Sequence, residues 1–405
     1  MISARVVSRV FALVATSSCA ALVVACGANN DKSGGDSPLD VGAAPLDSGA
    51  ADVAFDVADP TLDVGEGDSN TFDPDAACAA KSFGGTKIPL AIALVFDQSG
   101  SMSTDSRMTI AKAGVKKALS DPKFDDVAVG LFRFGYTTGL NGCTWDTTPT
   151  AAPVPLSTGR TELFKEIDKL TASGSTPTYS ALNSAYAWLG PKVLAKLPPE
   201  DGRVAIILVT DGAPTCGSET PDDYVALVAK GKKATIDTFI IGLPGSAEDF
   251  DPTTPSLGNT AAIMSKMAAA GTDPVNLPVG CDTDPTPVTS PPSKPCYFDM
   301  AGGVSTDGLA AALDNIRRAA SSCEYILPAG DASYDSSRPG IFVTDGKGVR
   351  TELPHCTDTA TPGPLGCWDW SDPGKTHIKL YGAGCDTVKT DDKTKVDILL
   401  PCRVK

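Results

Sequence analysis

Histidine, aromatic residues and positive charge are scarce in this chain of 405 residues. It has 2 His, 6% aromatic residues, and 34 Lys plus Arg against 49 Asp plus Glu, which gives a net charge of −15. The shortage of His argues against His-based catalysis and against zinc sites. The acidic balance argues against a nucleic-acid-binding protein, because no excess of positive charge is available to face phosphates. The length predicts two or three domains and at least one large core.

The negative charge is concentrated near the N-terminus. Residues 27–77 hold twelve acidic residues and a single basic one, Lys32, in a background of Ala, Gly, Ser and Pro. Such a segment cannot bury enough apolar surface to offset the entropy of ordering it. We therefore expect residues 26–77 to form a disordered acidic linker. Calcium binding by its spaced Asp residues is the less favoured alternative, because the EF-hand pattern with its terminal Glu is absent.

Residues 1–25 have the pattern of a secretory signal. Arg5 and Arg9 precede an apolar run over 10–25, which is shorter than the about 20 residues of a membrane-spanning helix. The run ends in Val23-Val24-Ala25-Cys26, which resembles the bacterial lipobox. The resemblance implies acylation of Cys26, which becomes the new N-terminus. Gly27 in place of Asp then implies sorting to the outer membrane, if the cell is Gram-negative.

Two other interpretations of this segment remain. Cys19 could be the lipidated residue, but the residues before it, Thr16-Ser17-Ser18, are polar. The segment could also be an ordinary cleavage site that contains a cysteine by chance.

Ten cysteines follow the signal, and no two of them are separated by two residues, so zinc-ribbon and thioredoxin motifs are absent. These residues are Cys78, Cys143, Cys216, Cys281, Cys296, Cys323, Cys356, Cys367, Cys385 and Cys402. An even number behind a secretion signal predicts five disulfides formed in an oxidising compartment. Cys281 and Cys296 flank a Pro-rich loop, which favours a local bridge. The other pairings do not follow from spacing.

From residue 88 onward, strand and helix patterns alternate. Four apolar runs, at 88–96, 127–134, 204–210 and 235–242, are too continuous for exposed strands. Such runs are typical of a parallel sheet that is covered on both faces. Between them, apolar residues recur at helical spacing. The alternation predicts an α/β fold with a doubly wound, mostly parallel sheet.

Side chains with oxygen atoms follow these runs. Asp97, Ser99 and Ser101 come after the first run, Thr176 opens a predicted helix, and Asp211 comes after the third run. In an open α/β sheet, ligands bind at the carboxyl ends of the strands. All five residues offer oxygen and none offers nitrogen or sulfur, which suits Mg²⁺ or Mn²⁺ better than zinc.

The sequence Asp97-x-Ser99-x-Ser101, followed by Thr176 and Asp211, resembles the metal-ion-dependent adhesion site of von Willebrand factor type A (VWA) domains. The elements occur in order and without departure from the pattern, and the resemblance covers about residues 88–323. Unrelated turns and helix caps are the alternative. The resemblance implies that Ser99 and Ser101 bind the cation directly and Thr176 directly or through water. Asp97 and Asp211 would act mainly through hydrogen bonds and bridging water.

The resemblance also implies a function. Neutral hydroxyls leave most of the cation's charge uncompensated, so the cation takes a further ligand from an Asp or Glu carboxylate of a partner protein. We therefore expect a lipid-anchored envelope protein, periplasmic or surface-facing, that binds a protein ligand through Mg²⁺ or Mn²⁺ and is not an enzyme. A structural or assembly scaffold in the envelope is the alternative. A metal-dependent hydrolase is less favoured, because no general base or nucleophile accompanies the site.

We expect the VWA domain to extend over residues 78–323 and to be followed by a disulfide-stapled, β-rich extension at 324–405. Short runs at 341–343, 377–381 and 396–400 predict strands in this extension. VWA domains bring their termini close together, so the resemblance further implies a Cys78–Cys323 bridge.

Three motifs in the extension favour structural roles. Gly374-Lys375-Thr376 resembles the end of a P-loop, but position 369 is Asp where the first Gly would stand. His355 and His377 are far in sequence from any nucleophile, which favours structural or surface positions. Trp368 and Trp370 are two residues apart, which predicts one core-facing side of a strand, with a sugar-stacking platform as the alternative.

Overall fold

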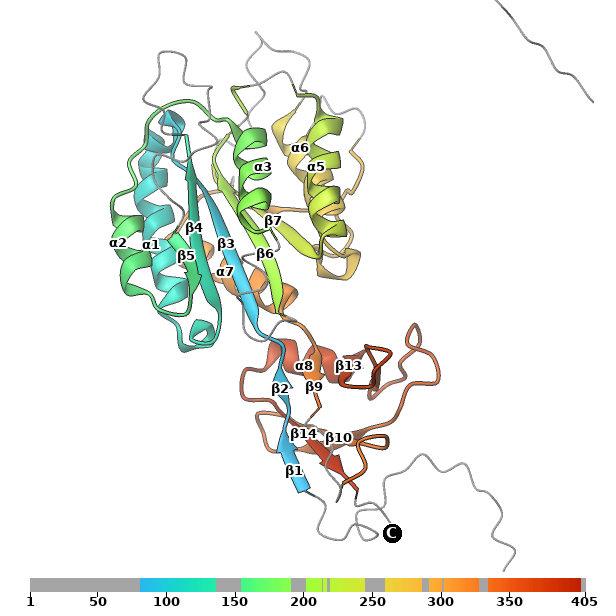
Figure 1. Ribbon diagram of the computed structural model, residues 1–405. Coiled ribbons are helices and arrows are strands. Elements are labelled where there is room, and N and C mark those ends of the chain that lie inside the picture. Colours follow the sequence, from blue (N-terminus) through green and yellow to red (C-terminus); the bar gives the residue numbers. More distant parts are fainter. Residues whose placement is uncertain are drawn as a thin grey trace, which may run out of the picture. The chain divides into compact units, whose positions relative to one another are not determined.

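The computed structural model describes residues 81–135, 154–190, 202–212, 214–216, 219–244, 259–285, 291–300, 302–327 and 334–401 (Figure 1). The predicted signal, the lipidation site at Cys26, the acidic linker, and Cys78, Cys143 and Cys402 lie outside the described residues. In the described part of the chain, no helix has the length and apolar character needed to cross a membrane.

A six-stranded sheet forms the centre of the α/β region. Its strand order is β5-β4-β3-β6-β7-β8. The strands are β3 (Leu90–Asp97), β4 (Ala128–Phe134), β5 (Val154–Ser157), β6 (Arg203–Thr210), β7 (Ile236–Gly242) and β8 (Phe298–Asp299). All neighbouring pairs are parallel except β4 with β5, which is antiparallel. The four apolar runs thus form the mostly parallel sheet that the sequence predicts.

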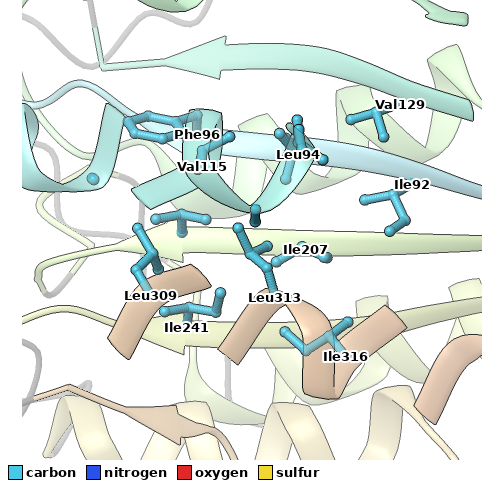
Figure 2. Packing of buried hydrophobic residues seen from close by; sticks show 14 of the residues in the cluster. Ile92, Leu94, Phe96, Val115, Val129, Ile207, Ile241, Leu309, Leu313 and Ile316 are labelled. Atoms are coloured by element: carbon cyan, nitrogen blue, oxygen red, sulfur yellow. The ribbon is translucent and has the colours of Figure 1, made fainter. Parts of the chain in front are cut away.

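Helices cover both faces of this sheet. On one side lie α1 (Arg107–Leu119), α2 (Thr161–Asp168) and α7 (Thr306–Ala320), and on the other α3 (Thr178–Trp188), α5 (Pro221–Lys233) and α6 (Thr260–Gly271). Alternate residues of a strand point to opposite faces. Accordingly, Leu94 and Phe96 pack with Val115 and Leu313 on the α1–α7 side (Figure 2), whereas Val95 packs on the α3–α5 side.

Two four-stranded antiparallel sheets make up a second region, which we call the β region. Their orders are β1-β14-β10-β11 and β12-β13-β9-β2. The elements are β1 (Lys81–Gly84), β2 (Thr86–Lys87), β9 (Glu324–Ile326), β10 (Gly340–Thr344), β11 (Arg350–Leu353), β12 (Cys367–Trp370), β13 (His377–Tyr381), α8 (Ala383–Thr390) and β14 (Lys395–Leu400). The three short runs predicted as strands lie in β10, β13 and β14.

The segment before β3 belongs to the β region. Strand β1 pairs with β14 and β2 pairs with β9 (Figure 1). The sequence placed residues 78–87 with the α/β region, but these strands complete sheets whose other members follow residue 323. Their pairing partners lie more than 200 residues further along the chain, so local sequence patterns could not indicate the association.

The disulfides differ in part from the expected ones. Cys281 and Cys296 are bridged across the Pro-rich loop, which is the local pair that the sequence favours. The expected Cys78–Cys323 bridge is wrong, because Cys323 pairs with Cys385 of α8. The cause is the pairing of β9 with β13, since β9 follows Cys323 and β13 leads into α8. A third bridge joins Cys356 to Cys367, and Cys216 is also disulfide-bonded.

The histidines and tryptophans of the β region have structural surroundings. Trp368 is buried in its core and meets both Trp370 and His355 edge to face. Nε2 of His355 lies 3.2 Å from the Asp369 carboxylate. His377 lies in β13, with its Nδ1 2.8 Å from the Thr376 hydroxyl. The pair of tryptophans therefore supports the core of this region, as the spacing predicted.

Candidate functional site

The predicted site residues are gathered at the carboxyl edge of the central sheet. Asp97 is the last residue of β3, and Asp211 directly follows β6, which is the neighbouring strand. Ser99 directly precedes the 3₁₀ helix η1 (Gly100–Ser106), and Ser101 lies in its first turn. Thr176 lies in the loop before α3. Three separate loops thus meet at one edge, as the topology of a parallel sheet requires.

Backbone hydrogen bonds hold two of these loops together. Gly100 N–H donates to the Gly174 carbonyl over 2.9 Å, and Ser173 N–H donates to the Gln98 carbonyl over 2.7 Å. Both bonds lie within three residues of Thr176. The loop that carries Thr176 is therefore fixed against the turn that carries Ser99.

A glycine at the end of β4 supports the same turn. Gly135 has φ +104°, and a Cβ atom built on it would lie 2.5 Å from the Ser99 backbone nitrogen. Beside it, Gln98 N–H donates to the Phe134 carbonyl over 2.8 Å. Only glycine accommodates both this backbone conformation and this close approach.

Asp97 is fully buried, and both of its oxygens accept hydrogen bonds. Oδ1 accepts from Ser99 N–H and Oδ2 from the Thr210 hydroxyl, each at 2.7 Å. Burial and the nearby charge of Asp211 raise the pKa of Asp97 to about 7, while the two hydrogen bonds act in the opposite direction. The ionised carboxylate is thus costly here unless positive charge is nearby.

Asp211 is buried too and is joined to the serines. Its Oδ1 accepts from the Ser101 hydroxyl at 2.8 Å, and that hydroxyl lies 3.0 Å from the Ser99 hydroxyl. Its Oδ2 accepts from the Arg107 guanidinium at 3.0 Å. Burial raises the pKa of Asp211, and the bonds from Ser101 and Arg107 oppose that rise. Both carboxylates are therefore anchored by protein donors, with the two hydroxyls beside them.

Thr176 is buried and is held by a reciprocal pair of hydrogen bonds with Thr215. Thr176 N–H donates to the Thr215 hydroxyl at 2.8 Å, and Thr215 N–H donates to the Thr176 carbonyl at 3.2 Å. Thr215 is followed by the disulfide-bonded Cys216. The loop after β6 thus positions Thr176 as well as Asp211.

Sequence reasoning missed three residues of this arrangement: Arg107, Thr210 and Thr215. Arg107 had a signal, because it lies four and eight residues before Ala111 and Val115 and so shares their buried helix face. Thr210 and Thr215 had none, since threonines near strand ends are common. Their roles depend on loops that meet only in the folded chain.

The residues present fit a hard divalent cation. The donors are hydroxyl and carboxylate oxygens, and the described residues contain no group of three or more His, Cys, Asp or Glu side chains that could form a metal site without hydroxyls. Arg107 pairs with Asp211, whereas the donors to Asp97 are the neutral Ser99 N–H and Thr210 hydroxyl, so ionisation of Asp97 leaves an excess of negative charge. A cation held by Ser99, Ser101 and Thr176, with Asp97 and Asp211 behind them, would relieve this excess of negative charge.

Comparison with known proteins identifies the α/β region. Residues 91–272 match the family model of the von Willebrand factor type A domain. No curated protein matches the chain.

Several solved structures resemble the chain at low identity. The pilus adhesin SpaC from Lactobacillus rhamnosus GG is 17% identical, with 80% of this chain and 41% of that chain covered and a TM-score of 0.40. BatB from Bacteroides thetaiotaomicron is 15% identical, covering 57% and 98%, with a TM-score of 0.34. Proximal thread matrix protein 1 from the mussel byssus, with a zinc-occupied adhesion site, is 17% identical, covering 41% and 38%, with a TM-score of 0.28.

The chain spans about two fifths of the length of SpaC. The family model covers residues 91–272, and the sheet in this region has a mostly parallel strand order with helices on both faces. Together they identify residues 91–272 as a von Willebrand factor type A domain.

Proposed function

We propose that this VWA domain binds a partner protein through a divalent cation, Mg²⁺ or Mn²⁺, and that a carboxylate of the partner completes the cation's ligands. The observation that carries the proposal is the row formed by Ser99, Ser101 and Asp211. The two hydroxyls lie 3.0 Å apart, and Ser101 is bonded to Asp211 at 2.8 Å. In this row the two hydroxyls would contact the cation directly. The Asp211 carboxylate would act through its hydrogen bond with Ser101.

Such a donor set favours binding over catalysis. Neutral hydroxyls leave the cation electron-poor, so an anionic group from outside is a strong additional ligand. A hydrolase would also need a general base or nucleophile beside the cation. The chain has two histidines, and both belong to the β region, where His355 faces Asp369 and His377 lies beside Thr376. We therefore propose a binding protein and not an enzyme.

The proposed location is the bacterial cell envelope, with a lipid anchor at Cys26. The signal pattern over residues 1–25 supports export, and the disulfides of the described region fit an oxidising compartment. We further propose that the acidic residues 26–77 link this anchor to the VWA domain. Within this proposal, the anchored protein is sorted to the outer membrane. A scaffold role in the envelope is the second candidate.

Affinity capture tests the proposal. The purified chain is incubated with solubilised envelope proteins in Mg²⁺ and, in parallel, in EDTA. A partner should be retained in Mg²⁺ and released by EDTA, and S101A should fail to retain it. S120A is the matched control, because Ser120 lies at the opposite end of α1 and bonds only the Lys116 carbonyl through its hydroxyl. Equal retention in Mg²⁺ and EDTA would rule out recognition through a cation.

A further inference from the structure

Arg107 is a buried positive charge inside the proposed cation site. Its side chain is about nine-tenths buried, and its Nη1 lies 3.0 Å from Oδ2 of Asp211. Its other acidic neighbour, Asp105, is 3.8 Å away and exposed. Its Nε is buried without a hydrogen-bond partner in the described structure. Burying a guanidinium with an unsatisfied N–H is costly, so the position calls for an explanation beyond packing.

The backbone before Arg107 is shaped to place it there. Asp105 and Ser106 have φ values of 49° and 62°, two consecutive left-handed residues that are not glycine. This conformation is unfavourable for both. The two residues form the kink between η1 and α1, and Arg107 begins α1 on the face that Ala111 and Val115 bury in the core. The strained turn and the helix face together direct the guanidinium onto Asp211.

Arg107 and a cation would share one carboxylate. Oδ1 of Asp211 is bonded to Ser101, a proposed cation ligand, and Oδ2 is bonded to Arg107. A cation held by the Ser101 hydroxyl is therefore close to a fixed positive charge. Repulsion between like charges is strong in a buried, weakly polar environment. The guanidinium also neutralises the charge of Asp211, which lowers the affinity of the site for free cations.

We infer that Arg107 is a positioning residue that keeps the site's affinity for a free divalent cation low, so that firm cation binding requires the partner's carboxylate. The inference rests on the proposed function and deepens it. A partner carboxylate adds the negative charge that Arg107 has cancelled. Cation and partner then raise each other's affinity by the same factor. Without Arg107 the cation would bind the empty site tightly, and the partner would add less.

Titration of Mg²⁺ into the full chain by calorimetry, with no partner present, tests the inference. R107Q keeps a polar side chain and removes the charge, and it should bind Mg²⁺ about tenfold more tightly than the parent chain or more. R107K is the matched variant, because it keeps the charge, and its affinity should stay within about threefold of the parent. A purely structural role for Arg107 would lower the thermal midpoint of both variants without tightening Mg²⁺ binding. Mg²⁺ affinity of R107Q equal to or weaker than the parent's would overturn the inference.

A folding defect in R107Q also decides the question. If R107Q is unfolded in EDTA and recovers its native circular dichroism in Mg²⁺, the cation has replaced the guanidinium as counter-charge, and the inference stands. If R107Q and R107M are both unfolded with and without Mg²⁺, Arg107 is a folding residue and the inference fails. Because no partner takes part, failure of metal-dependent capture would remove the proposed function and leave this result unaffected.

Discussion

Ser101 donates a hydrogen bond to Asp211 over 2.8 Å, although 110 residues separate them in the chain. The contact exists because β3 and β6 are parallel neighbours, with Phe96 opposite Val209, so their carboxyl ends lie side by side. The proposed cation site is therefore a property of the assembled sheet. Substitutions at the site and in its supporting loops should consequently separate effects on binding from effects on folding.

Asp97→Asn should weaken cation binding while leaving the chain folded. The amide has the shape of the carboxylate, can still accept from Ser99 N–H, and can donate to the Thr210 hydroxyl in place of accepting from it. Burial and Asp211 raise the pKa of Asp97 to about 7, so the ionised form destabilises the cation-free fold. At pH 8 in EDTA we expect D97N to be more stable by on the order of 1 kcal/mol. Urea unfolding with and without Mg²⁺ measures both effects, and a Mg²⁺-dependent gain in stability equal to that of the parent would contradict the role of Asp97.

Thr215→Val should weaken partner capture without removing any proposed ligand. The substitution keeps the shape of the side chain and deletes the hydroxyl that accepts from Thr176 N–H. Loss of one partly buried hydrogen bond costs about 1 kcal/mol and frees the loop that carries Thr176. Thr390→Val is the matched control, because Thr390 is exposed on α8 and bonds the Asp386 carbonyl. Capture assays and thermal midpoints of the two variants should be compared, and equal capture by both would show that Thr215 does not position Thr176.

Gly135→Ala should destabilise the chain by several kcal/mol and disturb the Ser99 turn. The added methyl would lie 2.5 Å from the Ser99 nitrogen, and the φ of +104° is unfavourable for alanine. Gly302→Ala is the control, since nothing lies within 4 Å of a Cβ at that exposed position. Urea unfolding should show an effect of about 0.5 kcal/mol or less for the control. A similar small effect for G135A would mean that the turn tolerates displacement.

Cys26→Ala should abolish lipid anchoring, because the acyl acceptor is lost. Detergent phase partitioning of cell extracts is the measurement. The parent chain should enter the detergent phase as the processed, acylated form. The Cys26→Ala variant should remain unprocessed and carry no acyl group. Cys19→Ala should behave as the parent. A mature parent chain found wholly in the aqueous phase would contradict the lipoprotein proposal.

The sequence was most informative where local patterns decide the structure. Continuous apolar runs predicted the strands of the parallel sheet. The positions of Asp97 and Asp211 at the ends of two such runs predicted that both belong to the site. Contacts made across the fold were harder to predict. Thr215 bonds Thr176 through two loops, and Cys323 pairs with Cys385 because β9 adjoins β13, which only the assembled β region shows. Arg107 could have been identified from the sequence, because it is a charged residue on an otherwise apolar helix face.

The strands that precede the VWA domain have a mechanical consequence. From Lys81, β1 and β2 lead directly into β3, which ends at Asp97 (Figure 1). In a chain tethered before residue 81, tension from a partner held at the proposed site would enter through the loops that carry Ser99, Thr176 and Asp211 and would reach the tether through β3, β2 and β1. Strand β3 is hydrogen-bonded on both sides by parallel neighbours, β4 and β6, so tension along it would load those ladders in shear, with many bonds sharing the load at once. The pairings of β1 with β14 and of β2 with β9 add hydrogen-bonded ladders between β3 and the tether.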